Sequence, residues 1–155
     1  MLYIKLFGDV MDLWHDLFLN YYLWIFIAAW ISSTLLKAAL HSWKHSTRFN
    51  LKYGFQNGGM PSGHTTVVSA LTFGLLFRTG LSDLFFVSAI FASIVINDAF
   101  RIRNNVGLQG EKLNELLRKF DEKTIHVVYG HSFAQVLAGM LLGFICALVF
   151  KIILF

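Results

Sequence analysis

The stretch Gly58-Gly59-Met60-Pro61-Ser62-Gly63-His64-Thr65-Thr66 decides how this sequence folds. It contains the only proline among 155 residues, and a long apolar run begins directly after it. Glycine permits unusual backbone angles, and proline fits the first turn of a helix without removing a needed donor. The stretch therefore predicts a loop that leads into a helix, with Ser62 and His64 at its start. Because a helix N-terminus favours phosphate, we expect half of a phosphate site here.

The composition outside this stretch excludes an ordinary soluble domain. Hydrophobic residues make up 56% of the chain and charged residues only 14%, against roughly 25% in soluble proteins. The mean hydropathy is +0.60. The charges cluster between apolar runs long enough to cross a bilayer, which takes about 20 residues each. We therefore predict an all-α, polytopic membrane helical bundle that forms a single domain over residues 1–155.

The apolar runs predict about four transmembrane helices. We expect them at about residues 16–40, 61–77, 81–102 and from 130 to the C-terminus, with a tight turn at Arg78-Thr79-Gly80. Residues 107–124 repeat leucines at helical spacing between charges, which predicts an amphipathic surface helix too polar to span. Residues 1–13 favour a short interfacial helix.

Four spans would bring the unusual polar residues to one face of the membrane. The end of the first span, the start of the second, the end of the third and the start of the fourth all lie on the same side. Those places hold Lys37, the loop at 61–64, Asp98, Arg101, Arg103 and His131. An intramembrane charge is costly and is usually functional or paired. The topology therefore predicts one polar site at this face.

The distribution of positive charge predicts which side the site faces. Ten of the thirteen Lys and Arg residues lie on the site side: Lys37, Lys44, Arg48, Lys52, Arg101, Arg103, Lys112, Arg118, Lys119 and Lys123. Lys5, Arg78 and Lys151 lie opposite. Leaving out Lys37, Arg48 and Arg103, which a phosphate site would need anyway, the bias remains seven to three. By the positive-inside rule the site faces the cytoplasm, as in an integral protein of a bacterial-type inner or plasma membrane.

The residue types at this face favour phosphoryl transfer without a metal. Cations and hydrogen-bond donors exceed acids, and Asp98 is the only acid near the site. Two-metal phosphatases need a carboxylate cluster, so we expect no cofactor. One histidine can attack phosphorus and a second can protonate the leaving group. Arg and Lys can hold the phosphate oxygens as charge builds on them.

Three pieces of the sequence carry a resemblance to a known family. They are the stretch 58–64, the segment 98–103 followed by Gly107, Gln109 and Leu113-Asn114, and Gly130-His131 followed by Gln135-Val136 and Gly139. Together they resemble the type 2 phosphatidic acid phosphatase superfamily, which shares its site with vanadium haloperoxidases, and in particular its small divergent branch. The resemblance covers about residues 30–150.

The resemblance implies a role for each site residue. His131 would be the nucleophile that forms a phosphohistidine, and His64 the general acid for the leaving group. The phosphate would be held by Lys37, Arg103, Ser62 and the amide of Gly63.

The sequence also departs from the superfamily pattern. Lys37 is followed at the motif spacing by Lys44 rather than Arg-Pro, and Arg48 is the nearest arginine, so the choice among these three stays open. Arg103 and His131 are separated by 27 residues, an insertion that the divergent branch shares. Gln135 stands where an acid usually orients the nucleophile. Its carbonyl can fix the tautomer of His131, while Asp98 is the alternative source of negative charge.

The expected function is that of a metal-independent lipid phosphate phosphatase acting on a phosphatidylglycerophosphate- or phosphatidate-type substrate. The alternative is a non-catalytic membrane protein that binds anionic lipid at a degenerate site. A vanadate-dependent haloperoxidase shares the residues, but the membrane setting and small size disfavour it. Expected partners are the lipid substrate and membrane lipids, not nucleic acid. Gly139, Gly143 and Ala147 favour helix packing within one chain, with a homo-oligomer left open.

Overall fold

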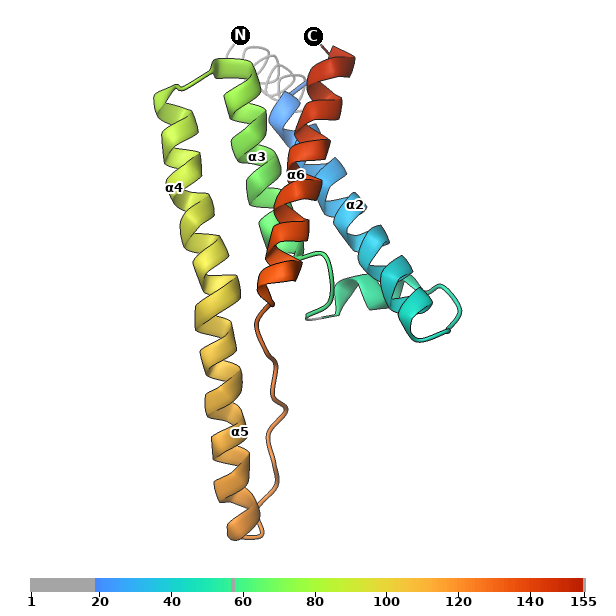
Figure 1. Cartoon of the computed structure of the whole chain (residues 1–155), viewed down its shortest axis with the longest axis vertical. Coiled ribbons are helices and arrows are strands. Elements are labelled where there is room, and N and C mark those ends of the chain that lie inside the picture. The colour runs from blue at the N-terminus through green and yellow to red at the C-terminus, as the bar shows by residue number, and fades with distance from the viewer. Residues whose placement is uncertain (1–18, 57, 155) are drawn as a thin grey trace, which may run out of the picture.

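The computed structural model describes residues 19–56 and 58–154, and its regular elements there are all helical (Figure 1). They are α2 (Tyr21–Lys44), the 3-10 turn η1 (Leu51–Phe55), α3 (Gly63–Thr79), α4 (Asp83–Asn97), the π-helical turn η2 (Asp98–Ile102), α5 (Arg103–Lys119) and α6 (Phe133–Leu154). The predicted all-α class is confirmed. The interfacial helix expected at residues 1–13 and the first residues of the first span lie outside the described residues.

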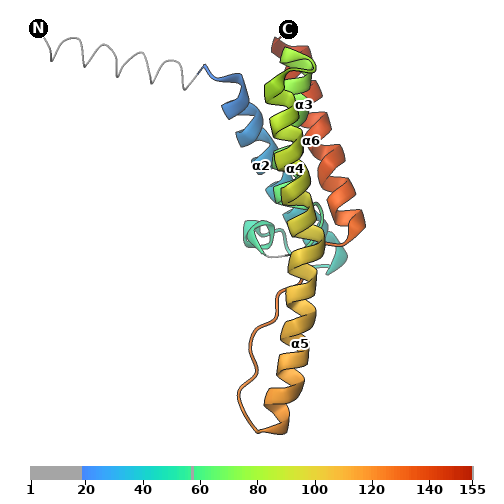
Figure 2. The same ribbon diagram turned by 90° about the vertical axis from the view of Figure 1, so that its left-hand side faces the viewer.

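The central helix α3 begins where the opening stretch predicts. Its N-cap is Ser62, whose Oγ accepts a hydrogen bond from the Thr65 N–H at 3.5 Å. Pro61 therefore lies just before the cap rather than in the first helical turn. The helix ends at Thr79, and its C-cap Gly80 has a φ of 65°, which suits a residue without a side chain. Helices α2, α4 and α6 all pack against α3 (Figures 1 and 2).

Helices α3 and α6 approach each other closely because α6 presents glycines to α3. A Cβ atom added at Gly139 would lie 2.7 Å from the Ser62 carbonyl oxygen, and one added at Gly143 would lie 2.5 Å from that of Thr66. Ala147, the next residue on this face, is fully buried. Small residues at four-residue spacing let helix backbones pack in this way. The predicted packing of this face within one chain is confirmed.

Three helices are long and apolar enough to cross a membrane. They are Tyr21–Lys44, the continuous helix Asp83–Lys119 and Phe133–Ile153. Helix α3 has 17 residues, which is the lower limit of the usual range for a spanning helix. A helical membrane bundle is therefore confirmed, whereas the predicted count of four spans is not.

The third predicted span does not end near Ile102. Helix α4 passes through η2 directly into α5, and α5 extends along the same direction beyond the other helices (Figures 1 and 2). Residues 83–106 contain neither glycine nor proline, so nothing in the sequence breaks the helix there. The amphipathic segment expected as a separate surface helix at 107–124 is thus the distal part of one long helix, which ends at Lys119.

The chain returns from the far end of α5 to the bundle as an extended segment, residues 121–132 (Figure 2). The Asn114 side chain holds this segment, because its Nδ2 donates to the Ile125 carbonyl at 2.9 Å and its Oδ1 accepts from the Ile125 N–H at 2.8 Å. At the end of the segment, the His131 N–H donates to the Ala99 carbonyl at 2.9 Å. These contacts bring His131 back to the level of η2.

Candidate active site

A cavity of about 780 Å³ lies between α2, α3, the α4–η2–α5 helix and the returning segment. Its polar end is lined by Lys37, Gly63, His64, Asp98, Arg103 and His131. These residues come from distant parts of the chain, and they lie together as the predicted convergence on one face requires. Figure 1 shows the start of α3 and the start of α6 close together at the middle of the molecule, where the continuous α4–α5 helix passes beside them.

The His131 ring is oriented by Gln135. The Gln135 side-chain oxygen accepts from the backbone N–H of Ser132 at 3.0 Å and lies 3.0 Å from His131 Nδ1. Because a backbone N–H can only donate, it fixes the amide oxygen of Gln135 at this position. Nδ1 must then carry the ring proton, which leaves the lone pair on Nε2. Gln135 thus sets the tautomer that a histidine nucleophile requires.

The surroundings of His131 keep its imidazole neutral. Burial lowers the pKa of His131, and the positive charges of Lys37 and Arg103 lower it further, while the hydrogen bond to Gln135 acts in the opposite direction. The net effect is a pKa below the usual value of 6.5. A neutral ring at neutral pH has the free electron pair that nucleophilic attack needs.

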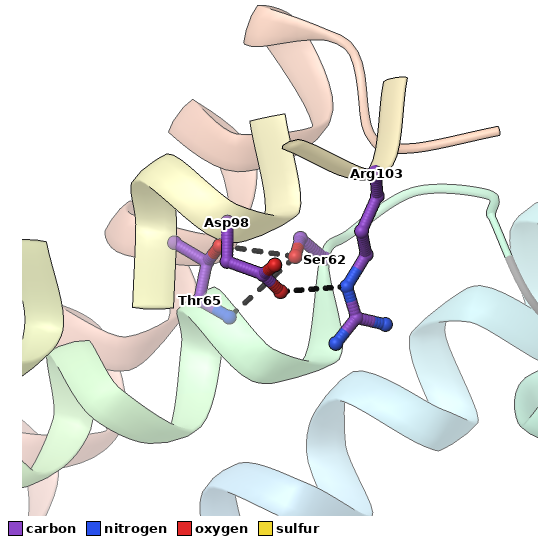
Figure 3. Close-up of polar contacts among 4 residues, drawn as sticks. All are labelled: Ser62, Thr65, Asp98 and Arg103. Carbon is purple, nitrogen blue, oxygen red and sulfur yellow. Dashed lines mark hydrogen bonds and ion pairs between the residues drawn. The ribbon is translucent and has the colours of Figure 1, made fainter. Parts of the chain in front are cut away.

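Arg103 and Asp98 form an ion pair at the edge of the cavity. Arg103 Nε donates to Asp98 Oδ2 at 2.7 Å (Figure 3). The figure shows the two terminal nitrogens of Arg103 extending beyond this contact. The Arg103 side chain is 51% exposed, so its outer edge can still meet a phosphate. Asp98 is therefore engaged with Arg103, and in the described contacts it is Gln135 that orients His131.

Carboxylates are scarce around this cavity. Among its described lining residues, Asp98 is the only acid. Across residues 19–56 and 58–154, no group of three His, Cys, Asp or Glu side chains is arranged to hold a metal ion. The polar side chains that line this cavity are mostly hydrogen-bond donors and cations, which suit a bound anion.

Two of the predicted phosphate ligands do not line the cavity. Ser62 is fully buried, and its Oγ is occupied by Thr65 as the cap of α3 (Figure 3). Its own N–H donates to the Gln135 carbonyl at 3.0 Å, which ties the start of α3 to α6. Arg48 lies exposed in the loop after α2, where its carbonyl accepts from the Ser42 hydroxyl at 3.4 Å. Ser62 thus positions the Gly63 amide, and Arg48 stands apart from the cavity.

The three candidates for the first motif are separated by the structure. Lys37 lines the large cavity, with its Nζ 3.5 Å from the Gln56 carbonyl. Lys44 lines a second, smaller cavity instead, and Arg48 lines neither. Lys37 is therefore the cation from α2 that faces the histidines.

The other end of the large cavity is apolar, and sequence reasoning did not identify its residues. Its walls are formed by Phe26, Trp30, Val67, Phe91 and Val95, among others. Trp30 and Phe91 are 47% and 53% exposed, so this end opens at the surface of the bundle. Helices that are apolar on all sides give no periodic signal that distinguishes a groove from a lipid-facing surface.

Comparison with known proteins agrees with the geometry of the site. The chain matches the model of the Divergent PAP2 family over residues 18–146, which include all three motif segments. It is also similar to the uncharacterized membrane protein YuiD of Bacillus subtilis (strain 168), with 36% identity covering 59% of this chain and 70% of that protein. No solved structure matches the chain. With its apolar helices and these matches, the chain is a membrane protein that belongs to the Divergent PAP2 family.

Proposed function

We propose that this protein is a metal-independent lipid phosphate phosphatase that acts through a phosphohistidine. One observation carries the proposal: His64, Arg103 and His131, from three separate segments, line the polar end of a cavity whose other end is apolar. In phosphoryl transfer, two histidines can serve as nucleophile and general acid, and an arginine and a lysine can stabilise the charge on the phosphate oxygens.

In the first half of the reaction, the lone pair of His131 Nε2 attacks phosphorus. A nitrogen–phosphorus bond forms as the bond between phosphorus and the lipid oxygen breaks. His64, at the first turn of α3, gives its proton to the departing oxygen, so the lipid leaves as a neutral alcohol. The Gln135 oxygen keeps the proton on His131 Nδ1 and holds the ring as positive charge develops on it.

In the second half, water replaces the protein nitrogen. The neutral His64 takes a proton from the water, a new oxygen–phosphorus bond forms, and the bond from phosphorus to His131 breaks. Lys37, Arg103 and the Gly63 amide would hold the non-bridging oxygens through both steps. The first N–H groups of a helix have no partner within the helix, so the start of α3 supplies donors that are already oriented.

The apolar part of the cavity supports a lipid substrate. A hydrocarbon chain placed between α2 and α4, along Trp30 and Phe91, would put its phosphate beside His131 and His64. Phosphatidate and phosphatidylglycerophosphate are the substrate types that we propose for a site facing the cytoplasm.

Phosphate release by the purified protein in detergent tests the proposal. We expect hydrolysis of these lipids that persists in EDTA, is inhibited by vanadate and falls at least about 1,000-fold in His131→Ala, because the covalent route is lost. His126→Ala is the matched control, since His126 is exposed in the returning segment and does not line the cavity. Full activity in His131→Ala would refute the assignment of His131 as the nucleophile. Lipid binding without any hydrolysis would favour the alternative of a non-catalytic anionic-lipid-binding protein.

Cysteine labelling of intact cells tests the proposed orientation. The natural Cys146 is buried, so it contributes little background. We expect an impermeant maleimide to label Leu81→Cys, at the exposed turn between α3 and α4, and to spare Thr47→Cys, in the exposed loop after α2. The reverse pattern would place the site on the outer side of the membrane.

A further inference from the structure

A second cavity of about 210 Å³ adjoins the candidate active site. The two cavities share Lys37, Gln56 and Gly58 in their walls. The α2 residues that line only the large cavity precede Lys37 in the helix. The α2 residues that line only the second cavity follow Lys37. The second cavity therefore lies on the opposite side of Lys37 from the apolar groove.

The walls of the second cavity are basic. Lys37, His41 and Lys44 stand four and three residues apart on one face of α2, and His45 follows them. Tyr53, Gln56 and Gln135 add further polar groups. Among the described residues that line this cavity, none is acidic. Such a lining suits an oxyanion.

A simpler reading is that these side chains only compensate the negative end of the α2 dipole. The last carbonyls of α2 already have partners, however. Those of His41, Ser42 and Trp43 accept from the N–H groups of residues 45, 47 and 46 respectively. The basic side chains are thus not required as helix caps.

The His41 ring is part of the wall of this cavity. It stacks on Tyr53, which also lines the cavity, with ring centroids 4.0 Å apart. The stacking holds this part of the basic wall in place.

We propose that the second cavity is an oxyanion site that receives inorganic phosphate as it leaves the reaction centre. This inference rests on the proposed phosphatase activity. Once water has broken the bond between phosphorus and His131, the lipid alcohol remains in the apolar groove. The phosphate is a free anion and cannot leave along apolar walls. Lys37 lines both cavities, so the anion can pass from one to the other without losing this cation.

Calorimetric titration with inorganic phosphate, at constant ionic strength in detergent, tests binding without any turnover. We expect the native protein to bind two phosphates, one in each cavity. In Lys44→Gln/His45→Gln, one of the two should bind at least about tenfold more weakly. Both side chains are exposed, so the fold should persist. Lys52→Gln is the control, because Lys52 is exposed on η1 and lines neither cavity. Unchanged stoichiometry and affinity in the double variant would overturn the second site.

Inhibition kinetics identify the source of the anion. We expect phosphate to inhibit lipid hydrolysis in a mixed manner in the native protein and in a purely competitive manner in Lys44→Gln/His45→Gln. If the double variant instead raises KM for phosphatidylglycerophosphate but not for phosphatidate, the cavity holds the second phosphate of a lipid headgroup, and the assignment to free phosphate is overturned. Absence of hydrolysis in the native protein would refute the proposed phosphatase, while the titration would still decide whether the oxyanion site exists.

Discussion

The two sides of α3 differ in how closely they pack against the neighbouring helices. On the side facing α6, glycines bring the backbones so close that an added Cβ at Gly143 would lie 2.5 Å from the Thr66 carbonyl. On the side facing α2 and α4, the same helix borders a cavity of about 780 Å³. One helix is thus fixed by close packing on one side and accessible on the other.

The difference shows how a small bundle can hold a precise site. The first turn of α3 carries His64, and α6 begins two residues after His131. The contact between α3 and α6 therefore sets the distance between the two histidines. The Ser62 N–H, which donates to the Gln135 carbonyl, completes this contact directly beneath the site. Rigid packing on one side permits an open groove on the other.

Substitution on the packed side should have the largest effect. Gly143→Val would force a branched side chain against the backbone of α3, and overpacking of this kind costs about 3 kcal/mol at its upper range. We expect a clear fall in Tm in detergent, together with loss of phosphate release. Ala134→Val, at an exposed position on the same helix, is the control. A native Tm in Gly143→Val would mean that the two helices are not held by this contact.

The backbone of Gln135 takes part in the contact between α3 and α6, and its side chain bonds to His131. Its replacement should have the next largest effect. Gln135→Leu removes the acceptor that fixes the His131 tautomer, so we expect kcat to fall about 10- to 100-fold, as for groups that orient a catalytic residue. Because burial lowers the pKa of His131, the native protein should lose activity on the acidic side only as the pH falls below 6.5, when His131 becomes protonated. On the alkaline side, activity should fall as His64 loses the proton that it gives to the leaving group.

The conservative variant Gln135→Glu separates orientation from charge. A carboxylate would still accept from Nδ1 and would favour the protonated ring, which raises the pKa of His131. The acidic limb of the pH–rate profile should therefore move to higher pH. If the limb stays in place in Gln135→Glu, His131 is not the group that titrates.

Substitution on the open side should have the smallest effect. Phe91→Ala removes part of the apolar wall, and we expect KM for long-chain substrates to rise about fivefold, with little change for short-chain analogues. Phe86→Ala is a matched control, because Phe86 also lies on α4 and is 52% exposed, against 53% for Phe91, but does not line the cavity. Equal KM values in the two variants would show that the lipid chain lies elsewhere.

Much of the site could be predicted from the chain itself. The loop before α3, the polar residues at the ends of the apolar runs and the even alternation of spans placed Lys37, His64, Arg103 and His131 on one face, and all four line the cavity. The spacing of Gly139 and Gly143 likewise predicted a close helix contact. These inferences depend on local patterns and on the requirement that each apolar run cross the bilayer.

Other features could not be predicted because they depend on contacts between distant segments. The helix boundary expected near Ile102 is an exception, because the sequence itself has no glycine or proline there and the helix continues into α5. Ser62 fits a phosphate ligand by motif, yet its burial against α6 makes it a cap. The apolar groove has no signal of its own among side chains that are apolar everywhere.

By itself, the sequence determined that this is an all-α membrane protein with a cationic, histidine-bearing face, because hydropathy and the order of spans are properties of the chain. Only the tertiary structure decided which of these residues share a cavity and which support it. Lys37, Lys44 and Arg48 are equivalent candidates in the sequence. In the structure, Lys37 lines the large cavity, Lys44 lines only the second cavity, and Arg48 lines neither. From the sequence alone, the loop before α3 was expected to bind phosphate through Ser62 and the Gly63 amide. In the structure, Ser62 is buried and bonded to Gln135, whereas His64 lines the same cavity as His131.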